Sequence, residues 1–297
     1  MPGFFTLVII GFIAQLIDGS LGMAYGVSTS TLMLSAGLVP VLASASIHLA
    51  ELGTTASSAF SHWRFGNVDR GKVLWLGLPG AVAAFFGAVA LSSLSAQAAR
   101  PWVAVILAGL GVHILIRFAF RARTKPVVER PIAQRFLVPL GLVAGFMDAL
   151  GGGGWGPIAT PTLLASGRMQ PARVVGTVDT SEFLVALGAS AGFLLALDFR
   201  HVPWVVVGAL LLGGVVAAPV AAYLVRLVPV RIMGTAVGGL ILITNARTLL
   251  AAWSLPADGV SFSIGLLWLA ALVHAVSLTR REHPRHQAPA RSLSASD

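Results

Sequence analysis

Apolar runs long enough to cross a membrane recur along nearly the whole chain, and they limit its fold more than any other feature. A helix needs about 20 apolar residues to cross the hydrocarbon core, where it satisfies its own backbone hydrogen bonds. Runs of this kind lie at 43–63, 73–92, 101–120, 172–197, 203–224, 231–252 and 260–279. Of the 297 residues, 56% are hydrophobic and only 10% are charged. We therefore predict an all-α polytopic membrane protein in which residues 1–297 form a single membrane domain.

Two further apolar regions, 3–37 and 135–167, are interrupted near their middles. The first contains the sequence Asp18-Gly-Ser-Leu-Gly22, and the second contains Asp148-Ala-Leu-Gly-Gly-Gly-Gly-Trp-Gly156. Each half of such a region is too short to cross the membrane comfortably. We predict that each region forms a re-entrant hairpin, a broken helix that enters and leaves the membrane on the same side.

The two interrupted regions match each other at a constant offset of 130 residues. After a slip of one residue the match continues into the next apolar run. The matched pairs include Gly11 with Gly141, Asp18 with Asp148, Gly22 with Gly152, Tyr25 with Trp155, Gly26 with Gly156, Pro40 with Pro171, His48 with Asp179, and Glu51 with Glu182. We predict two repeats, 3–120 and 135–252, each with one hairpin and three transmembrane helices, and an extra C-terminal transmembrane helix at 260–279.

Basic residues crowd the connector 121–134 and the tail 280–297. Lys and Arg are enriched on the cytoplasmic side of membrane proteins, so we expect both segments to be cytoplasmic. Both lie on one side only if the hairpins make no net crossing. Each repeat then crosses the membrane an odd number of times, which predicts that the second repeat is inverted relative to the first.

The net charge of +9 reflects these topology signals, and we expect no binding of nucleic acid. The chain has no cysteine, which excludes disulfides, thiolate metal sites and cysteine nucleophiles. We expect no cofactor and no metal ion.

The helix breaks are candidate binding sites for a small anion. The N-terminus of a half-helix presents a positive dipole end and unpaired N–H groups, and glycines let the backbone approach a ligand closely. The predicted substrate-binding residues are Asp18, Gly22, Asp148, Gly151, Gly152, Gly153, Gly154, Trp155 and Gly156. Two alternatives remain: the glycines allow close packing of helices, and the two aspartates cap the half-helices.

Ionisable residues within apolar segments are costly and therefore candidates for function. Glu51 and Glu182 occupy matched positions, and each follows a second ionisable residue by three positions. That residue is His48 in the first repeat and Asp179 in the second, and the spacing places each pair on one helix face. We predict that these four residues couple proton movement to anion movement.

The sequence Gly-Phe-Met-Asp-Ala-Leu-Gly-Gly-Gly-Gly-Trp-Gly-Pro at 145–157, followed by Pro171 and Glu182, resembles the TauE/SafE sulfite exporter family. The resemblance covers both repeats, roughly residues 5 to 250. It implies a secondary transporter, an exporter of sulfite, an organosulfonate or a related sulfur oxyanion or carboxylate. It also implies a multi-pass protein of the bacterial inner membrane, and we expect its C-terminus to be cytoplasmic.

Two other functions fit the same architecture. An anion channel would have the same sequence features as a transporter. An intramembrane enzyme is a weaker alternative, because Gly188-Ala-Ser-Ala-Gly192 matches a nucleophile elbow only where a strand precedes it. We therefore predict that the chain is not an enzyme and that its partners are a small anion and the lipid bilayer. The sequence leaves its oligomeric state open.

Overall fold

The computed structural model describes residues 3–21, 23–120, 128–224 and 230–282, and these ranges contain helices and loops but no strand. The first half of the chain contains α1 (Phe4–Leu21), α2 (Tyr25–Ser35), α3 (Pro40–Arg64), α4 (Arg70–Ser93) and α5 (Ala96–Phe120). The second half contains α6 (Gln134–Gly151), α7 (Trp155–Ser166), α8 (Pro171–Leu197), a short 3-10 helix η1 (Phe199–His201), α9 (Trp204–Leu224) and α10 (Val230–Ala252). The last helix is α11 (Ala257–Glu282). Most of the predicted connector and tail, 121–127 and 283–297, lies outside the described residues.

Within the part of the chain that the structure describes, five helices are long and apolar enough to cross a membrane: α4, α5, α8, α10 and α11. They confirm five of the predicted spans. The predicted span 43–63 forms α3, which is continuous over 25 residues but carries too many polar side chains to meet the same criterion. The predicted span 203–224 forms α9, whose described apolar part is the shorter segment Trp204–Ala217. The architecture is therefore that of a polytopic α-helical membrane protein.

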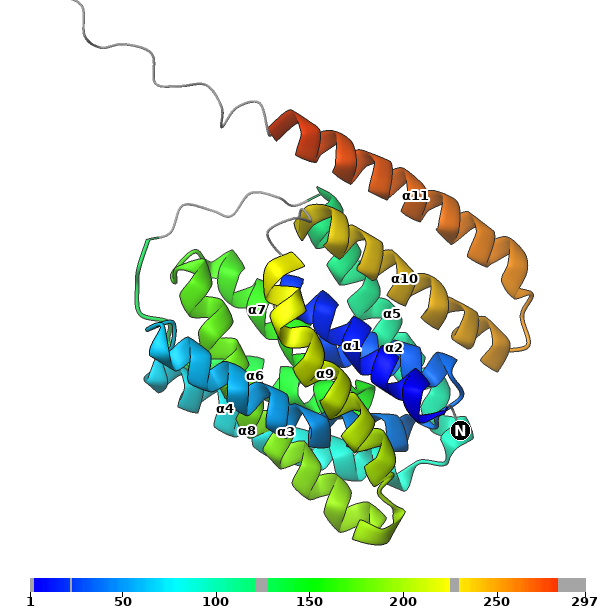
Figure 1. Ribbon diagram of the computed structural model, residues 1–297, viewed down its shortest axis with the longest axis horizontal. Coiled ribbons are helices and arrows are strands. Elements are labelled where there is room, and N and C mark those ends of the chain that lie inside the picture. The colour runs from blue at the N-terminus through cyan, green and yellow to red at the C-terminus, as the bar shows by residue number, and fades with distance from the viewer. Residues whose placement is uncertain (1–2, 22, 121–127, 225–229, 283–297) are drawn as a thin grey trace, which may run out of the picture.

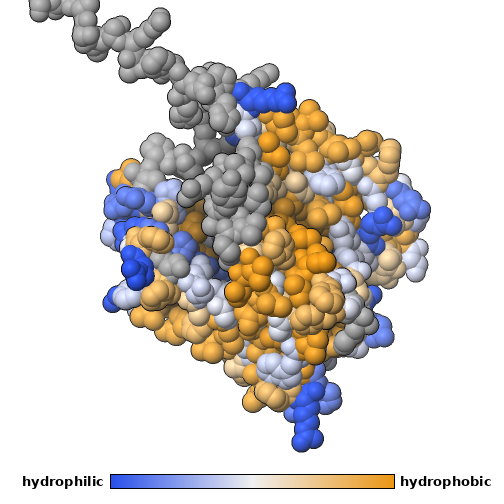
Figure 2. Space-filling model, viewed as in Figure 1, coloured by the Kyte–Doolittle hydropathy of each residue, from blue (hydrophilic) through white to orange (hydrophobic). Residues whose placement is uncertain are grey.

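The surface of the protein is hydrophobic, as a lipid environment requires. Hydrophobic residues cover the centre of the face shown in Figure 2, and hydrophilic residues gather toward its left and right edges. Helix α11 is the extreme case, since only 11% of its apolar segment is buried within the protein. It packs on α10 at the outer edge of the helix assembly (Figure 1).

Both predicted helix breaks are present: α1 ends at Leu21 and α2 begins at Tyr25, and residues 152–154 separate α6 from α7. The helices that flank them begin and end at matched positions, because α1 and α6, and likewise the starts of α2 and α7, are offset by 130 residues. Gly152 ends α6 in the left-handed region with φ 69°, and Gly153 follows with φ 154°. Side chains rarely adopt either conformation, so the break requires glycine at both positions.

The two halves of the chain are interleaved, because a hairpin helix of each half packs on a helix of the other. Helix α1 packs against α9, and α6 packs against α4 (Figure 1). At the first contact a Cβ on Gly11 would lie 2.7 Å from the carbonyl oxygen of Leu210, and at the second a Cβ on Gly141 would overlap the carbonyl oxygen of Leu76. Close approach of two backbones without side chains between them is how helices pack in membranes.

Candidate functional site

Asp148 organises the second helix break. One carboxylate oxygen, Oδ1, accepts hydrogen bonds from the amides of Gly154 at 2.6 Å and Trp155 at 3.0 Å. The carbonyl oxygen of the same residue accepts the amide of Gly153 at 3.0 Å. The acid therefore satisfies the amide groups that the break would otherwise leave unpaired, and it lies at the positive end of α7.

The first break is built in the same way around Asp18. Its Oδ1 accepts hydrogen bonds from the amides of Ala24 at 2.7 Å and Tyr25 at 3.0 Å. These residues match Gly154 and Trp155 of the second half at the offset of 130. Gly22, a predicted substrate ligand, lies outside the described residues.

Asp18 and Asp148 thus have the capping role that was one of the two alternatives for them. The expectation of free amide donors at the second break is wrong for this conformation, because Asp148 already accepts hydrogen bonds from the amides of residues 152–155. The proposed contact between the glycines and an anion stays a prediction.

The glycines also bring the two breaks into contact. A Cβ on Gly26 would lie 2.7 Å from Cα of Gly153, and a Cβ on Gly153 would overlap the amide nitrogen of Val27. The hydroxyl of Ser30 donates a hydrogen bond to the carbonyl of Gly151 at 2.7 Å. These glycines therefore allow the helices to pack closely, which is the alternative to a role in letting a ligand approach the backbone.

Trp155 is fully buried and fixes the start of α7. Its indole N–H donates a hydrogen bond to the carbonyl of Val178 on α8 at 3.0 Å. A Cβ on Gly80 of α4 would lie 2.6 Å from the ring, so the ring covers that glycine. The predicted substrate residue thus has a packing and hydrogen-bonding role between three helices.

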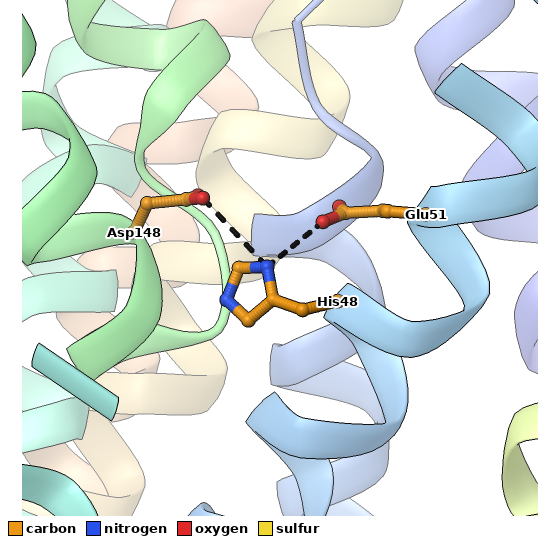
Figure 3. A group of neighbouring side chains, drawn as sticks. All are labelled: His48, Glu51 and Asp148. Atoms are coloured by element: carbon orange, nitrogen blue, oxygen red, sulfur yellow. Dashed lines mark hydrogen bonds and ion pairs between the residues drawn. The ribbon is translucent and has the colours of Figure 1, made fainter. Parts of the chain in front are cut away.

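His48, Glu51 and Asp148 form a buried cluster between the two halves of the chain (Figure 3). Nδ1 of His48 lies 3.0 Å from Oε2 of Glu51 and 3.8 Å from Oδ2 of Asp148. The contact between His48 and Glu51 confirms that they share one face of α3, as their spacing predicts. No pattern in the sequence predicts that Asp148, nearly 100 residues away, lies beside them.

The three potential ligand atoms of this cluster lie within 4.8 Å of one another, which is compact enough for a metal ion. Imidazole and carboxylate groups are common ligands of Zn²⁺. The distance between His48 and Glu51 is, however, that of an ordinary hydrogen bond, so this pair is satisfied without a metal ion.

The matched residues of the second half, Asp179 and Glu182, lie at a cavity and not in a closed cluster. The cavity has a volume of about 40 Å³ and is lined by Gln15, Asp18, Tyr25, Glu51, Thr54, Thr55, Ser58, Asp179 and Glu182. A buried water needs on the order of 10–15 Å³ by the same measure, so the cavity has room for a few waters or one small ion. Four of the lining residues are acids, and no Lys or Arg is among the residues that line the cavity.

Sequence reasoning identified Asp18 and the three acids on α3 and α8 but missed the neutral lining residues. Glu51, Thr54, Thr55 and Ser58 follow the spacing i, i+3, i+4 and i+7 along α3. This spacing defines one face of a helix, so a polar stripe was readable in the sequence. Gln15 and Tyr25 carry no comparable signal, because only the packing of α1 and α2 brings them to the cavity.

Comparison with known proteins agrees with this architecture. The model of the family described as "Sulfite exporter TauE/SafE" matches residues 7–248. A protein of Bacillus subtilis (strain 168) named "Probable membrane transporter protein YtnM" is 47% identical over 93% of this chain and 94% of its own length. A second protein of that organism, "Probable membrane transporter protein YdhB", is 27% identical over 77% of this chain and 90% of its own length. No solved structure matches. With its apolar helices, paired helix breaks and these relatives, the chain belongs to the sulfite exporter TauE/SafE family, whose members are membrane transporters and not enzymes.

Proposed function

We propose that this protein is a secondary transporter that moves a small anion together with protons. The anion is sulfite, an organosulfonate, or a related sulfur oxyanion or small carboxylate, as the family description suggests. The observation that carries the proposal is the polar cavity lined by Asp18, Glu51, Asp179 and Glu182 in the interior of a membrane protein. Ionisable groups at such depth are costly and mark the paths of ions and protons.

The four acids explain why protons accompany the anion. Ionised carboxylates repel an anion, and a carboxylate can only accept hydrogen bonds. A protonated carboxyl group carries no charge and donates one hydrogen bond, so protonation turns the cavity into a site for an anion. The amide of Gln15 adds a donor that needs no proton.

We further propose that the two halves are inverted repeats that alternate around this cavity, each with a re-entrant hairpin and three crossing helices. Support comes from the matched helix boundaries and from the paired contacts of α1 with α9 and of α6 with α4. In a second conformation, the amides of Gly154 and Trp155 leave Asp148 and meet the anion, which gives the glycine run its predicted substrate contact.

Flux of isotopically labelled sulfite into proteoliposomes tests the transport proposal. With an acidic exterior we expect sulfite uptake to be several-fold faster than at equal pH, and we expect sulfite to drive proton entry. An organosulfonate and a small carboxylate serve as competitors that define the substrate class. Flux that is far faster than that of a carrier and independent of the proton gradient would identify an anion channel instead.

The topology is tested by single cysteines, because the natural chain has none. A cysteine at Arg200 should react with an impermeant thiol reagent from outside the cell, and a cysteine at Arg123 only from inside. Labelling of both from the same side would rule out hairpins without a net crossing. The position of Arg123 itself lies outside the described residues.

A further inference from the structure

One ring nitrogen of His48 faces two carboxylates that belong to different halves of the chain. Nδ1 is at hydrogen-bond distance from Oε2 of Glu51, 3.0 Å, and 0.8 Å farther from Oδ2 of Asp148, at 3.8 Å (Figure 3). We assign the ring proton to Nδ1, because both neighbouring groups are carboxylates and carboxylate oxygens accept hydrogen bonds. A single N–H group cannot donate a strong hydrogen bond to both oxygens at these distances. The hydrogen bond to Glu51 is therefore one of two that this N–H group could form, and the other is to Asp148.

The second acceptor is vacant. Oδ2 of Asp148 is buried and accepts no hydrogen bond from any described residue, although the side chain is only 3% exposed. Its other oxygen holds the amides of Gly154 and Trp155 at the start of α7. The carboxyl group is thus held in place through one oxygen, and Oδ2 remains an acceptor on the side that faces His48.

The ring of His48 is fully buried, and the polar contact of hydrogen-bond length that the structure gives it is the one to Glu51. Its other nitrogen, Nε2, is buried and has no hydrogen-bond partner among the described residues. One face of the ring is stacked on Phe193, with ring centroids 6.0 Å apart and an interplanar angle of 18°. A flat apolar neighbour permits sliding without the loss of a polar contact.

Glu51 connects this pair to the cavity. Its carboxylate lines the cavity together with the other charged or titratable groups that face it, which are Asp18 of α1, Tyr25 of α2, and Asp179 and Glu182 of α8. A proton that enters the cavity and binds Glu51 makes its carboxyl group a weaker acceptor. The N–H of His48 then has a better partner in Asp148.

We propose that His48 is a positioning residue that transmits protonation of Glu51 to the second hairpin by transferring its Nδ1–H hydrogen bond from Glu51 to Asp148. The proton on Nδ1 stays on the ring, and the only proton gained is the one that Glu51 takes from the cavity. The new bond draws charge from the carboxylate that holds the amides of Gly154 and Trp155. This loosens the start of α7.

Among the described residues, no histidine forms an ion pair with Asp18 of the first hairpin. Asp18 holds two amides as Asp148 does, but the position that matches His48 is Asp179, which has no N–H to donate. We therefore expect the second hairpin to respond to protonation of Glu51 and the first to remain unaffected. This inference rests on the proposed function, because it assigns Glu51 to proton uptake.

The experiment uses one reactive cysteine in each hairpin of the otherwise cysteine-free chain. Ser28→Cys on α2 and Thr160→Cys on α7 replace buried hydroxyl groups that have no hydrogen-bond partner among the described residues. Labelling by a small permeant thiol reagent is measured in purified full-length protein between neutral and acidic pH. The ratio of the two rates cancels the pH dependence of thiol chemistry itself.

In the parent background we expect acidification to raise the Thr160→Cys rate relative to the Ser28→Cys rate about tenfold, which corresponds to about 1.4 kcal/mol. Glu51→Gln should fix the ratio near its acidic value at every pH. His48→Leu should abolish the response, whereas His48→Asn, whose amide nitrogen lies close to the place of Nδ1, should restore most of it.

The proposal would be overturned if His48→Leu showed the same change of labelling ratio with pH as the parent, or if His48→Asn lost that change as completely as His48→Leu. Either result would mean that the N–H group does not transmit the protonation of Glu51. If His48→Leu does not fold, His48→Asn and Glu51→Gln still decide the question. The readout needs no transported anion, so absence of sulfite flux would count against the proposed function and leave this result standing.

Discussion

The two hairpins begin in the same way and differ in what faces them. In each, an aspartate, Asp18 or Asp148, accepts two amides across the helix break through one oxygen. Beside Asp148 the first half of the chain supplies His48, whose partner Glu51 also lines the cavity. The residue of the second half that matches His48 is Asp179, which lines the cavity directly. The same capping of the backbone can therefore occur in both halves, while the side chain at the matched position on the following helix differs.

The largest effect is expected where the two hairpins meet. Gly153→Val places a side chain on the backbone of Val27 and forces a branched residue into a φ of 154°. Overpacking and backbone strain together should destabilise the protein by about 3 kcal/mol or more. We expect a clear fall in Tm in detergent and poor recovery on size exclusion.

Gly109→Val is the control, because a Cβ at this position on α5 has open space around it. An unchanged Tm in Gly153→Val would mean that the hairpins do not depend on their mutual contact. The glycine run would then be free to serve the anion alone.

The next effect compares the two capping acids. Asp148→Ala removes two hydrogen bonds to a carboxylate that is 2% exposed, and each such bond contributes about 1.5–3 kcal/mol. We expect a loss of about 3 kcal/mol, measured by chemical or thermal unfolding. Asp18→Ala should cost about half as much, because Asp18 borders the cavity and water can replace it. Equal losses of stability in Asp148→Ala and Asp18→Ala would show that the surroundings of the two acids do not differ in hydration.

A smaller effect concerns the proton dependence of flux. Glu182 lies at the cavity among three other acids, whereas Oε2 of Glu51 has Nδ1 of His48 at 3.0 Å. Glu182→Gln supplies a neutral group without a proton, so sulfite flux should persist to a pH higher by about one unit. Glu51→Gln should displace the midpoint less but lower the maximal rate. Identical pH profiles for both variants and the parent would remove the acids from proton coupling.

The smallest effect lies outside the membrane helices, at Asp69, which caps α4 by accepting the amide of Lys72 at 3.1 Å. Burial alone would raise its pKa, but the hydrogen bonds and charge of Lys72 and the charge of Arg173 outweigh burial and hold the pKa below its ordinary value. The residue that directly precedes α9 in the second half is Pro203, which has no carboxylate to accept such hydrogen bonds.

Because the folded-state pKa of Asp69 is lowered, its stabilisation is complete above the ordinary value of about 3.9 and is lost as the pH falls through the lower folded value. Asp69→Asn should therefore reduce Tm at neutral pH and leave it unchanged under strongly acidic conditions. The pair is partly exposed to solvent, so the change should stay below about 1 kcal/mol. A loss of the same size at every pH would assign the effect to shape and not to charge.

The sequence alone was sufficient for the class of fold, the position of both helix breaks and the matched positions of the helices that flank them. Hydropathy decides which segments are helices in a membrane, since a lipid-exposed backbone has no other way to satisfy its polar groups. The motif from Gly145 to Pro157 was also sufficient for the family. These features are local, and they repeat along the chain.

Only the tertiary structure decided what each acid does. The spacing of His48 and Glu51 predicts their contact, because helical geometry fixes neighbours three residues apart. The approach of Asp148 to His48, the contact of Gly26 with Gly153, and the arrival of Gln15 at the cavity depend on how α1, α3, α6 and α8 pack. No periodicity along the chain predicts such contacts. They join segments that are far apart in sequence, and this separation determines neither the distance between the segments nor their relative orientation.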